Sequence, residues 1–285
     1  MGTLIIGLSI SMLLYILAAG LTLIFGMLNV VNFAHGAFYM LGAFLAYQAV
    51  AWSGQIWWSL LLAPIIVGGV GALMEVFTLR PIYAREHHFQ LLITFGAVLV
   101  LDEAVRLIWG VDYKAIQTPD LLSGSFALFG SEIPYYRIFV IVVGVVIAAL
   151  LSALIGGTQI GAIVRAASGN PAMTQCLGID VKRVRTRVFI LGTALAGFAG
   201  VVSAPMFPVL PGMGLGIILD CFMVVVIGGL GSLNGALVGA LIIGLSRAFG
   251  QQFVPEWIAV LTYGLFITVL LLRPQGLLAR KGRQA

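Results

Sequence analysis

The residues with the most chemical potential in this sequence are amides, an imidazole, a phenol and a carboxylate set in apolar surroundings. Such side chains can hydrogen-bond a small polar solute or satisfy backbone groups at a helix break, and ionisable groups inside membrane segments usually have a function. Their spacing fits neither a metal site nor a catalytic constellation, so we expect a chain without cofactor or metal and without enzymatic activity. The polar residues that we single out are Asn29, Asn32, His35, Tyr39 and Asp220.

Four of these residues lie in the stretch NVVNFAHGAFYMLGAF. Asn32 can cap a helix that continues through His35, Tyr39 and Ala43, which are four residues apart and share one face. In one interpretation, Asn29 and Asn32 satisfy backbone amides at a helix break and His35 bonds to a neighbouring helix. In the other, the break lines a solute pathway, because irregular backbone at membrane depth is tolerated only in buried or wet positions. Both predict that His35 faces protein and not lipid.

Composition predicts an integral membrane protein. The chain has 285 residues, of which 61% are hydrophobic and only 9% charged, whereas a soluble domain has roughly 25% charged residues. The net charge of +5 is spread over short loops, which indicates membrane topology and not nucleic-acid binding. We therefore expect an all-α polytopic bundle forming one membrane domain over residues 1–285.

Apolar stretches long enough to cross a membrane recur along the whole chain. They cover residues 4–26, 34–52, 58–79, 90–109, 136–156, 188–205, 216–230, 233–249 and 257–272. The segment GGLGSLNG (228–235) is either a turn between two spans or the break of a re-entrant pair, so eight and nine crossings both remain open.

The distribution of Lys and Arg orients these spans, because basic residues concentrate in cytoplasmic loops. If the spans alternate, one side carries eleven basic residues: Arg80, Arg85, Arg165, Lys182, Arg183, Arg185, Arg187, Arg273, Arg280, Lys281 and Arg283. The other side carries four: Arg106, Lys114, Arg137 and Arg247. This predicts a cytoplasmic loop at 161–187, a cytoplasmic C-terminus, a periplasmic loop at 110–135 and, by parity, a periplasmic N-terminus.

The stretch GNPAMTQCLGID combines the start and stop signals of a short helix outside the membrane. Asn170 is a good N-cap and Pro171 suits the first helical position. Gly178 can end the helix in a left-handed conformation, and Asp180 can cap the next helix, which enters the membrane. Two interpretations are open: a well-capped loop, or a docking hook for a cytoplasmic partner.

Two classes of membrane transport protein can be compared with the sequence. NPA is also the tripeptide of aquaporin-type channels, but such channels need two copies and this chain has one, in a basic loop. A secondary transporter would carry ion-coupling groups in its helices, and Asp220 is the candidate that lies deepest in an apolar span. No G-x-x-x-x-G-K-[ST] motif occurs in the chain, so ATP-driven transport would need a partner that hydrolyses ATP.

Small residues recur at the spacing that lets membrane helices approach closely. Two interpretations remain open for them, packing inside the chain and a seam between subunits. The two rows are Gly192, Ala196 and Gly200, and Gly231, Gly235 and Gly239. Cys176 and Cys221 lie far apart, and we expect both to be small packing residues without a disulfide.

Four ordered blocks of the sequence resemble the H-type permease of branched-chain amino acid importers of the ATP-binding cassette (ABC) class. They are GLTLIFGMLNVVNFAHGAFYMLGAF (20–44), GNPAMTQCLGIDVKRVRTRVFILGTALAGFAGVV (169–202), GGLGSLNGALVGALIIG (228–244) and LRPQGLLAR (272–280). The resemblance covers nearly the whole chain. One position departs from it, because such permeases often carry a basic residue where this chain has Asp220, which implies a different solute or a partner for Asp220 on a second permease.

The resemblance implies an importer of several subunits in a bacterial inner membrane. Its partners would be a second permease (an M-type chain or a copy of this one), two ATPase subunits that bind ATP and Mg²⁺, and a periplasmic solute-binding protein. The solute would be a branched-chain amino acid or a related urea, short amide or aromatic acid. The residues that would transmit motion from the ATPase are Arg165, Asn170, Pro171, Ala172, Leu177, Gly178 and Asp180.

Overall fold

The computed structural model describes residues 1–83, 85–128 and 131–278. The chain is built almost entirely from helices. They are α1 (Gly2–Leu28), α2 (Ala34–Ser53), α3 (Ser59–Met74), α4 (His87–Trp109), α5 (Tyr135–Gly157), α6 (Gln159–Gly169), α7 (Pro171–Cys176), α8 (Val181–Ser203), α9 (Met213–Gly228), α10 (Leu233–Phe253) and α11 (Ile258–Leu272). Arg280, Lys281 and Arg283 of the charge argument lie outside the described residues.

Short irregular helices mark several helix ends. A π-helical turn, η1 (Glu75–Leu79), and a 3₁₀ turn, η2 (Arg80–Ile82), extend α3. Two more 3₁₀ turns are η3 (Asp120–Leu122) and η4 (Pro255–Trp257). A π-helical turn often marks a functional position, and η1 begins at a buried carboxylate that is described below.

The loop 110–135 has regular structure of its own. It contains an antiparallel hairpin of β1 (Ser125–Leu128) and β2 (Ser131–Pro134). Ile133 of β2 is buried, which gives the hairpin an apolar anchor on the bundle. A single bridge between Lys114 and Val209 ties the start of this loop to the segment before α9.

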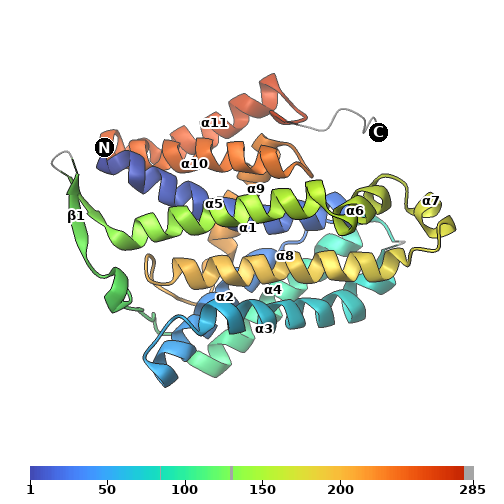
Figure 1. Cartoon of the computed structure of the whole chain (residues 1–285), viewed down its shortest axis with the longest axis horizontal. Helices are drawn as coiled ribbons and strands as arrows, with labels where there is room; N and C mark the ends of the chain where they lie inside the picture. Colours follow the sequence, from blue (N-terminus) through green and yellow to red (C-terminus); the bar gives the residue numbers. More distant parts are fainter. Residues whose placement is uncertain (84, 129–130, 279–285) are drawn as a thin grey trace.

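The long helices run roughly side by side and leave two distinct ends (Figure 1). The N-terminus and the β-hairpin lie at one end, which we call the hairpin end, and α6 and α7 lie at the other, the hook end. Six helical segments are long and apolar enough to cross a membrane: Gly2–Leu28, Ser59–Ile82, Tyr135–Gly157, Val181–Ser203, Leu233–Phe253 and Pro255–Leu272. The chain is therefore a multi-pass α-helical membrane protein.

Helix α1 forms the centre of the bundle. Its residues from Ser11 to Ile24 are all buried, and it packs against α5, α8, α9 and α10. By contrast, α11 has a single buried residue, Thr262, and packs mainly against α9 and α10. The apolar outer surface of α11 and α5 is what a chain surrounded by lipid or by another subunit presents.

The small-residue rows pack inside the chain. A methyl group on Gly200 would lie 2.0 Å from the carbonyl oxygen of Tyr39 in α2, so the two backbones touch there. Gly235 and Gly239 meet the backbone of α9 in the same way, Gly192 lies against α1, and Ala196 is fully buried. Gly231 does not belong to the second row, because it precedes α10 and turns the chain with a φ of +81°.

Candidate functional site

The break between α1 and α2 is built from the two asparagines. Asn29 closes α1 in the left-handed conformation, with φ 56°. The Oδ1 atom of Asn32 accepts a hydrogen bond from the backbone N–H of Ala34 at 3.1 Å, so this amide caps the start of α2. The sequence placed both asparagines at a helix break, and the structure shows the same arrangement.

His35 and Tyr39 face protein. The Nε2 atom of His35 lies 2.9 Å from the carbonyl oxygen of Leu17 in α1, and the residue is fully buried. Tyr39 is only 3% exposed, within electrostatic reach of Ser203 and Asp220. The close contacts of α2 with α8 and α9 make this segment a rigid wall, and solute passage along it stays a prediction.

Asp220, the charged residue that lies deepest in an apolar span of the sequence, is paired within the chain. Its carboxylate oxygens accept two hydrogen bonds from the Nη atoms of Arg247, each at 2.5 Å. The expectation that Asp220 signals a different solute or pairs with a second permease therefore needs revision, because α10 supplies the partner. A sequence signal existed, since Arg247 stands alone in an otherwise uncharged apolar span and a buried charge needs a partner.

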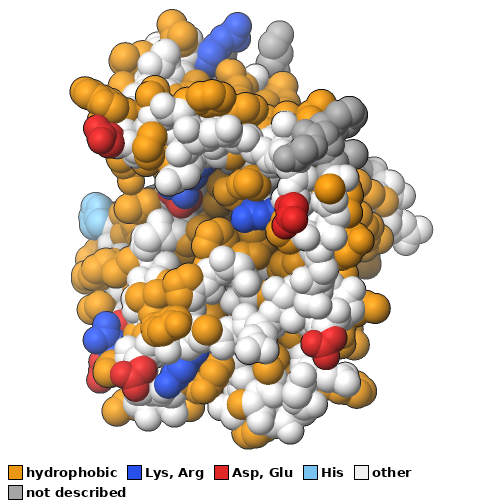
Figure 2. All heavy atoms as spheres, turned by 90° about the vertical axis from the view of Figure 1, so that its left-hand side faces the viewer, with side chains coloured by type: hydrophobic (Ala, Val, Ile, Leu, Met, Phe, Trp, Pro, Cys, Tyr) orange, Lys and Arg blue, Asp and Glu red, His pale blue; other side chains and the backbone are white. Residues whose placement is uncertain are grey.

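A cavity of about 610 Å³ adjoins this ion pair at the hairpin end, between α1, α10 and α11. Arg247 forms part of its wall, and the other lining residues are Thr3, Ile6, Ile10, Phe207, Ala248, Gln251, Gln252, Ile258, Ala259, Thr262 and Tyr263. Figure 2 views the hairpin end and shows a hollow near its centre, in which charged side chains lie among apolar ones. Here a charged side chain lies in the wall of a sizeable, largely apolar cavity.

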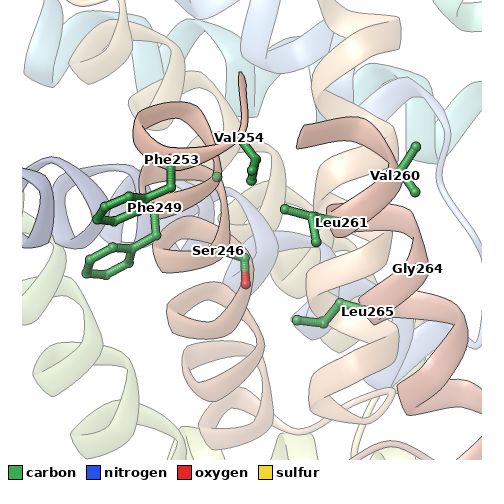
Figure 3. Close-up of a pocket in the computed structure, with 9 residues that line it drawn as sticks. Ser246, Phe249, Phe253, Val254, Val260, Leu261, Gly264 and Leu265 are labelled. Atoms are coloured by element: carbon green, nitrogen blue, oxygen red, sulfur yellow. The ribbon is translucent and has the colours of Figure 1, made fainter. Parts of the chain in front are cut away.

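A second cavity, of about 480 Å³, lies between α10 and α11 (Figure 3). Its walls are Phe249, Phe253, Leu261, Leu265 and other uncharged residues, with Ser246 as the one side-chain polar group. Such a surface has few groups that could hydrogen-bond a polar solute. The cavity reflects the loose packing of α11 against α10.

The hook, residues 170–180, has the predicted caps. The Oδ1 atom of Asn170 accepts from the backbone N–H of Met173 at 2.9 Å, and Pro171 begins α7. Gly178 follows with a φ of +80°. The Oδ1 atom of Asp180 then accepts from the backbone N–H groups of Lys182 and Arg183 at the start of α8, at 3.0 and 3.2 Å.

The hook presents apolar side chains to its surroundings. Met173 is 62% and Leu177 72% exposed, and the thiol of Cys176 is exposed beside them. The expectation that Cys176 is a packing residue is therefore wrong, whereas Cys221 is fully buried. Arg165 lies in α6, a separate helix that precedes the hook, and not in the hook itself.

A polar cluster, which we call the Glu75 cluster, joins η1 and η2 to the start of α8. Glu75 is fully buried and receives hydrogen bonds from Arg80 at 3.1 Å, Tyr83 at 2.9 Å and Thr186 at 2.8 Å. The guanidinium of Arg185 lies 5.3 Å from the centre of the Tyr83 ring. Burial, followed by the charge of Glu75, raises the pKa of Tyr83, so this phenol remains a hydrogen-bond donor.

The sequence did not reveal this cluster. Glu75 lies near the end of the apolar stretch 58–79, where a carboxylate can reach water or pair locally. Pairing occurs, but water is excluded, and Thr186 joins from a helix more than a hundred residues away. Among the described residues, no group of three or more His, Cys, Asp or Glu side chains could hold a metal ion.

These features define a multi-pass helical membrane protein. It has a capped hook at one end and, at the other, a largely apolar cavity beside an ion pair. Residues 3–270 match the family described as the branched-chain amino acid transport system / permease component, and the chain belongs to this family. No solved structure matches the chain.

Several relatives match the chain along nearly its whole length. The chain is 31% identical to the high-affinity branched-chain amino acid transport system permease protein BraD of Pseudomonas aeruginosa, covering 96% of this chain and 94% of BraD. It is 28% identical to LivH of Escherichia coli K12, over 93% and 91% of the two chains. A probable LivH of Methanocaldococcus jannaschii is 31% identical, over 94% and 89%. The chain thus resembles H-type permeases, as its sequence blocks indicated.

Proposed function

We propose that this chain is the membrane permease subunit of an ATP-driven importer of branched-chain amino acids in a bacterial inner membrane. Membership of the permease family and similarity to BraD and LivH over nearly the full length support this function. In this proposal residues 1–285 form one membrane domain that binds no ATP itself.

The proposed topology has nine crossings, made by α1 to α5 and α8 to α11. The hairpin end with residues 110–135 is periplasmic, and the hook end with residues 161–187 and the C-terminus is cytoplasmic. The excess of Lys and Arg in loops of the hook end supports this orientation. A re-entrant segment is not needed, because α9 and α10 are two antiparallel helices joined by a turn over residues 229–232.

The proposed assembly pairs this chain with a second permease, either an M-type chain or a copy. Two ATP-binding cassette subunits bind ATP and Mg²⁺ on the cytoplasmic side, and a periplasmic binding protein delivers the solute. The pathway opens alternately to the two sides as ATP binding and hydrolysis bias the conformations.

The observation that carries the proposal is the construction of the hook. A six-residue helix has little stability of its own, yet this one is fixed at both ends by caps and exposes Met173 and Leu177. A capped helix with exposed apolar side chains suits insertion into a groove on a cytoplasmic ATPase. Asp180, the last residue of the hook, is also the N-cap of α8. In the proposal, displacement of the hook therefore moves a membrane helix.

The Glu75 cluster extends this coupling. Thr186 lies one and a half turns into α8 and bonds to Glu75 at the end of α3. In the proposal, force from the hook therefore reaches α3 and α8 together, and these two helices pack along much of their length.

The test is purification of the tagged chain from its native membrane in mild detergent, with mass spectrometry of the subunits recovered with it. We expect two kinds of partner, an ATPase subunit and a second permease. Met173→Ser/Leu177→Ser should reduce ATPase recovery while the second permease is retained. Ile160→Ser is the matched control, because Ile160 is equally exposed (62%) but lies on α6. A lone homo-oligomer, under conditions that keep a control importer intact, contradicts the proposal.

A secondary transporter that uses Asp220 as a proton or cation site is disfavoured by the ion pair. Arg247 already neutralises Asp220 with two hydrogen bonds. A lone cation could bind this carboxylate only by displacing the guanidinium, which would leave Arg247 unpaired.

A further inference from the structure

We propose that Asp220 and Arg247 form a two-point binding site for the solute, Asp220 holding its α-ammonium group and Arg247 its α-carboxylate. The aliphatic side chain then occupies the adjoining cavity between α1, α10 and α11. This inference rests on the proposed importer function and assigns residues of this chain to solute recognition.

The charges suit a zwitterion. Asp220 and Arg247 present one negative and one positive group, paired at 2.5 Å and positioned on two neighbouring helices. Arginine is well shaped for a carboxylate, because its guanidinium can give two parallel hydrogen bonds. Entry of a zwitterion replaces one ion pair by two, so neither protein charge is left unpaired in the membrane interior.

The exposures suit exchange. The side chain of Arg247 is 32% exposed and forms part of the cavity wall, whereas that of Asp220 is only 8% exposed. A solute in the cavity therefore meets the guanidinium first and reaches the carboxylate as the pair separates. The Glu75 cluster lacks this property, because its carboxylate is fully buried and is held by Arg80, Tyr83 and Thr186.

The walls suit an aliphatic side chain. Apolar groups line part of the cavity: Ile6 and Ile10 from α1, Ala248 from α10, and Ile258 and Ala259 from α11. The remaining wall includes the polar residues Thr3, Gln251, Gln252, Thr262 and Tyr263. The cavity volume of about 610 Å³ falls within the usual range for small-molecule sites, about 300–1,000 Å³. A zwitterionic head beside an apolar wall describes an amino acid with an aliphatic side chain.

This site separates the solute classes that the sequence left open. Urea and short amides carry neither charge, and aromatic acids carry a carboxylate without an ammonium group. Such solutes engage at most half of the Asp220–Arg247 pair, and breaking the pair without replacing both partners is unfavourable. The site therefore selects free amino acids.

The test uses the complete importer, purified with its partners and placed in phosphatidylglycerol nanodiscs without the binding protein, with [³H]leucine as the probe. The main variant is Asp220→Asn/Arg247→Gln, which removes both charges together. The matched control is Arg106→Gln, which breaks the Asp102–Arg106 pair at the same end of the bundle but away from the cavity. Binding-protein-stimulated ATP hydrolysis is measured in parallel to report intact assembly.

We expect the double variant to bind leucine at least about tenfold more weakly, the loss that follows removal of charge-assisted hydrogen bonds. ATP hydrolysis and binding by Arg106→Gln should match the unaltered importer. Equal leucine binding by the double variant overturns the inference, and it leaves the importer function standing if ATP hydrolysis is retained. Loss of the ATPase partner from the unaltered complex instead overturns the proposed function.

Two further measurements keep the inference falsifiable if the double variant does not fold. Leucinol lacks the carboxylate and 4-methylpentanoic acid lacks the ammonium group, so neither should displace [³H]leucine from the unaltered importer. Ala259→Phe fills the cavity from an exposed wall position and should weaken leucine binding more than glycine binding. Displacement by either analogue, or equal effects on the two amino acids, contradicts the site.

A zwitterionic lipid headgroup carries the same two charges as the solute, so its binding must be tested in a separate experiment. Leucine binding is therefore repeated in nanodiscs that contain phosphatidylethanolamine. Unchanged binding supports a solute site. Loss of leucine binding in these nanodiscs assigns the pair to a lipid headgroup and overturns the inference.

Discussion

The two ends of this bundle each bury a carboxylate, and they satisfy it in opposite ways. At the hook end, Glu75 is fully buried and held by Arg80, Tyr83 and Thr186. At the hairpin end, Asp220 has one ionic partner, Arg247, beside a cavity of about 610 Å³. A saturated, closed cluster fixes helices to one another, whereas a two-member pair at a cavity can open. We therefore expect the hook end to be rigid and the ion pair at the hairpin end to exchange its partners for a solute.

The largest effect should come from breaking the closed cluster. Glu75→Ala leaves Arg80 without its carboxylate and the Tyr83 hydroxyl without its acceptor, so we expect a loss of about 3 kcal/mol or more in stability. The measurement is the melting temperature of the purified importer in detergent. Glu103→Ala on α4 is the control, because Glu103 is exposed. Similar melting temperatures for the two variants would show that the Glu75 cluster does not hold the bundle together.

A smaller effect should come from the open pair, and it should depend on which charges are removed. Asp220→Ala leaves Arg247 unpaired and should cost about 2–3 kcal/mol, whereas Asp220→Asn/Arg247→Gln leaves no unpaired charge and should cost less. Thermal unfolding of single and double variants measures this non-additivity. If the double variant is the least stable, the pair is a structural element like the Glu75 cluster, and the contrast between the ends fails.

The caps of the hook should affect coupling more than stability. Asn170→Ala removes a side-chain cap and should cost about 1 kcal/mol of local helix stability. Gly178→Ala places a Cβ in a left-handed conformation and should cost a similar amount. We expect both variants to assemble but to show a reduced ratio of solute transported to ATP hydrolysed. Gly169→Ala is the control, since a methyl group there meets no other atom within 4 Å, and an equal reduction would contradict the role of the caps.

Chemical labelling of the two cysteines should show the orientation of the bundle in the membrane. Cys176 is exposed on the hook and Cys221 is buried beside Asp220. A membrane-impermeant maleimide should label Cys176 in inside-out vesicles only, and Cys176→Ser should abolish the signal. Labelling of intact right-side-out cells would place the hook on the periplasmic side and reverse the proposed topology.

Local features of the sequence predicted local structure well. The caps at Asn170, Gly178 and Asp180 depend on neighbouring residues and formed as expected. The polytopic helical class and the family also followed from hydropathy and ordered sequence blocks.

Features that depend on distant residues were missed. The partner of Asp220 lies 27 residues away on another helix, and Thr186 reaches Glu75 across 111 residues. Hydropathy places Asp220 and Glu75 in spans and Thr186 at the end of a loop, but it cannot say which helix faces turn toward one another. Gly231 shows the same limit on a smaller scale, because its row spacing fits a helix while its backbone turns.

The most direct test of the central claim is solute uptake into proteoliposomes that contain this chain, its ATPase and permease partners, and the binding protein outside. The account predicts that [³H]leucine accumulates against its gradient only when ATP and Mg²⁺ are enclosed, and that Met173→Ser/Leu177→Ser lowers this uptake while Ile160→Ser does not. Accumulation without ATP, driven by an imposed proton or sodium gradient, would contradict the account and identify a secondary transporter.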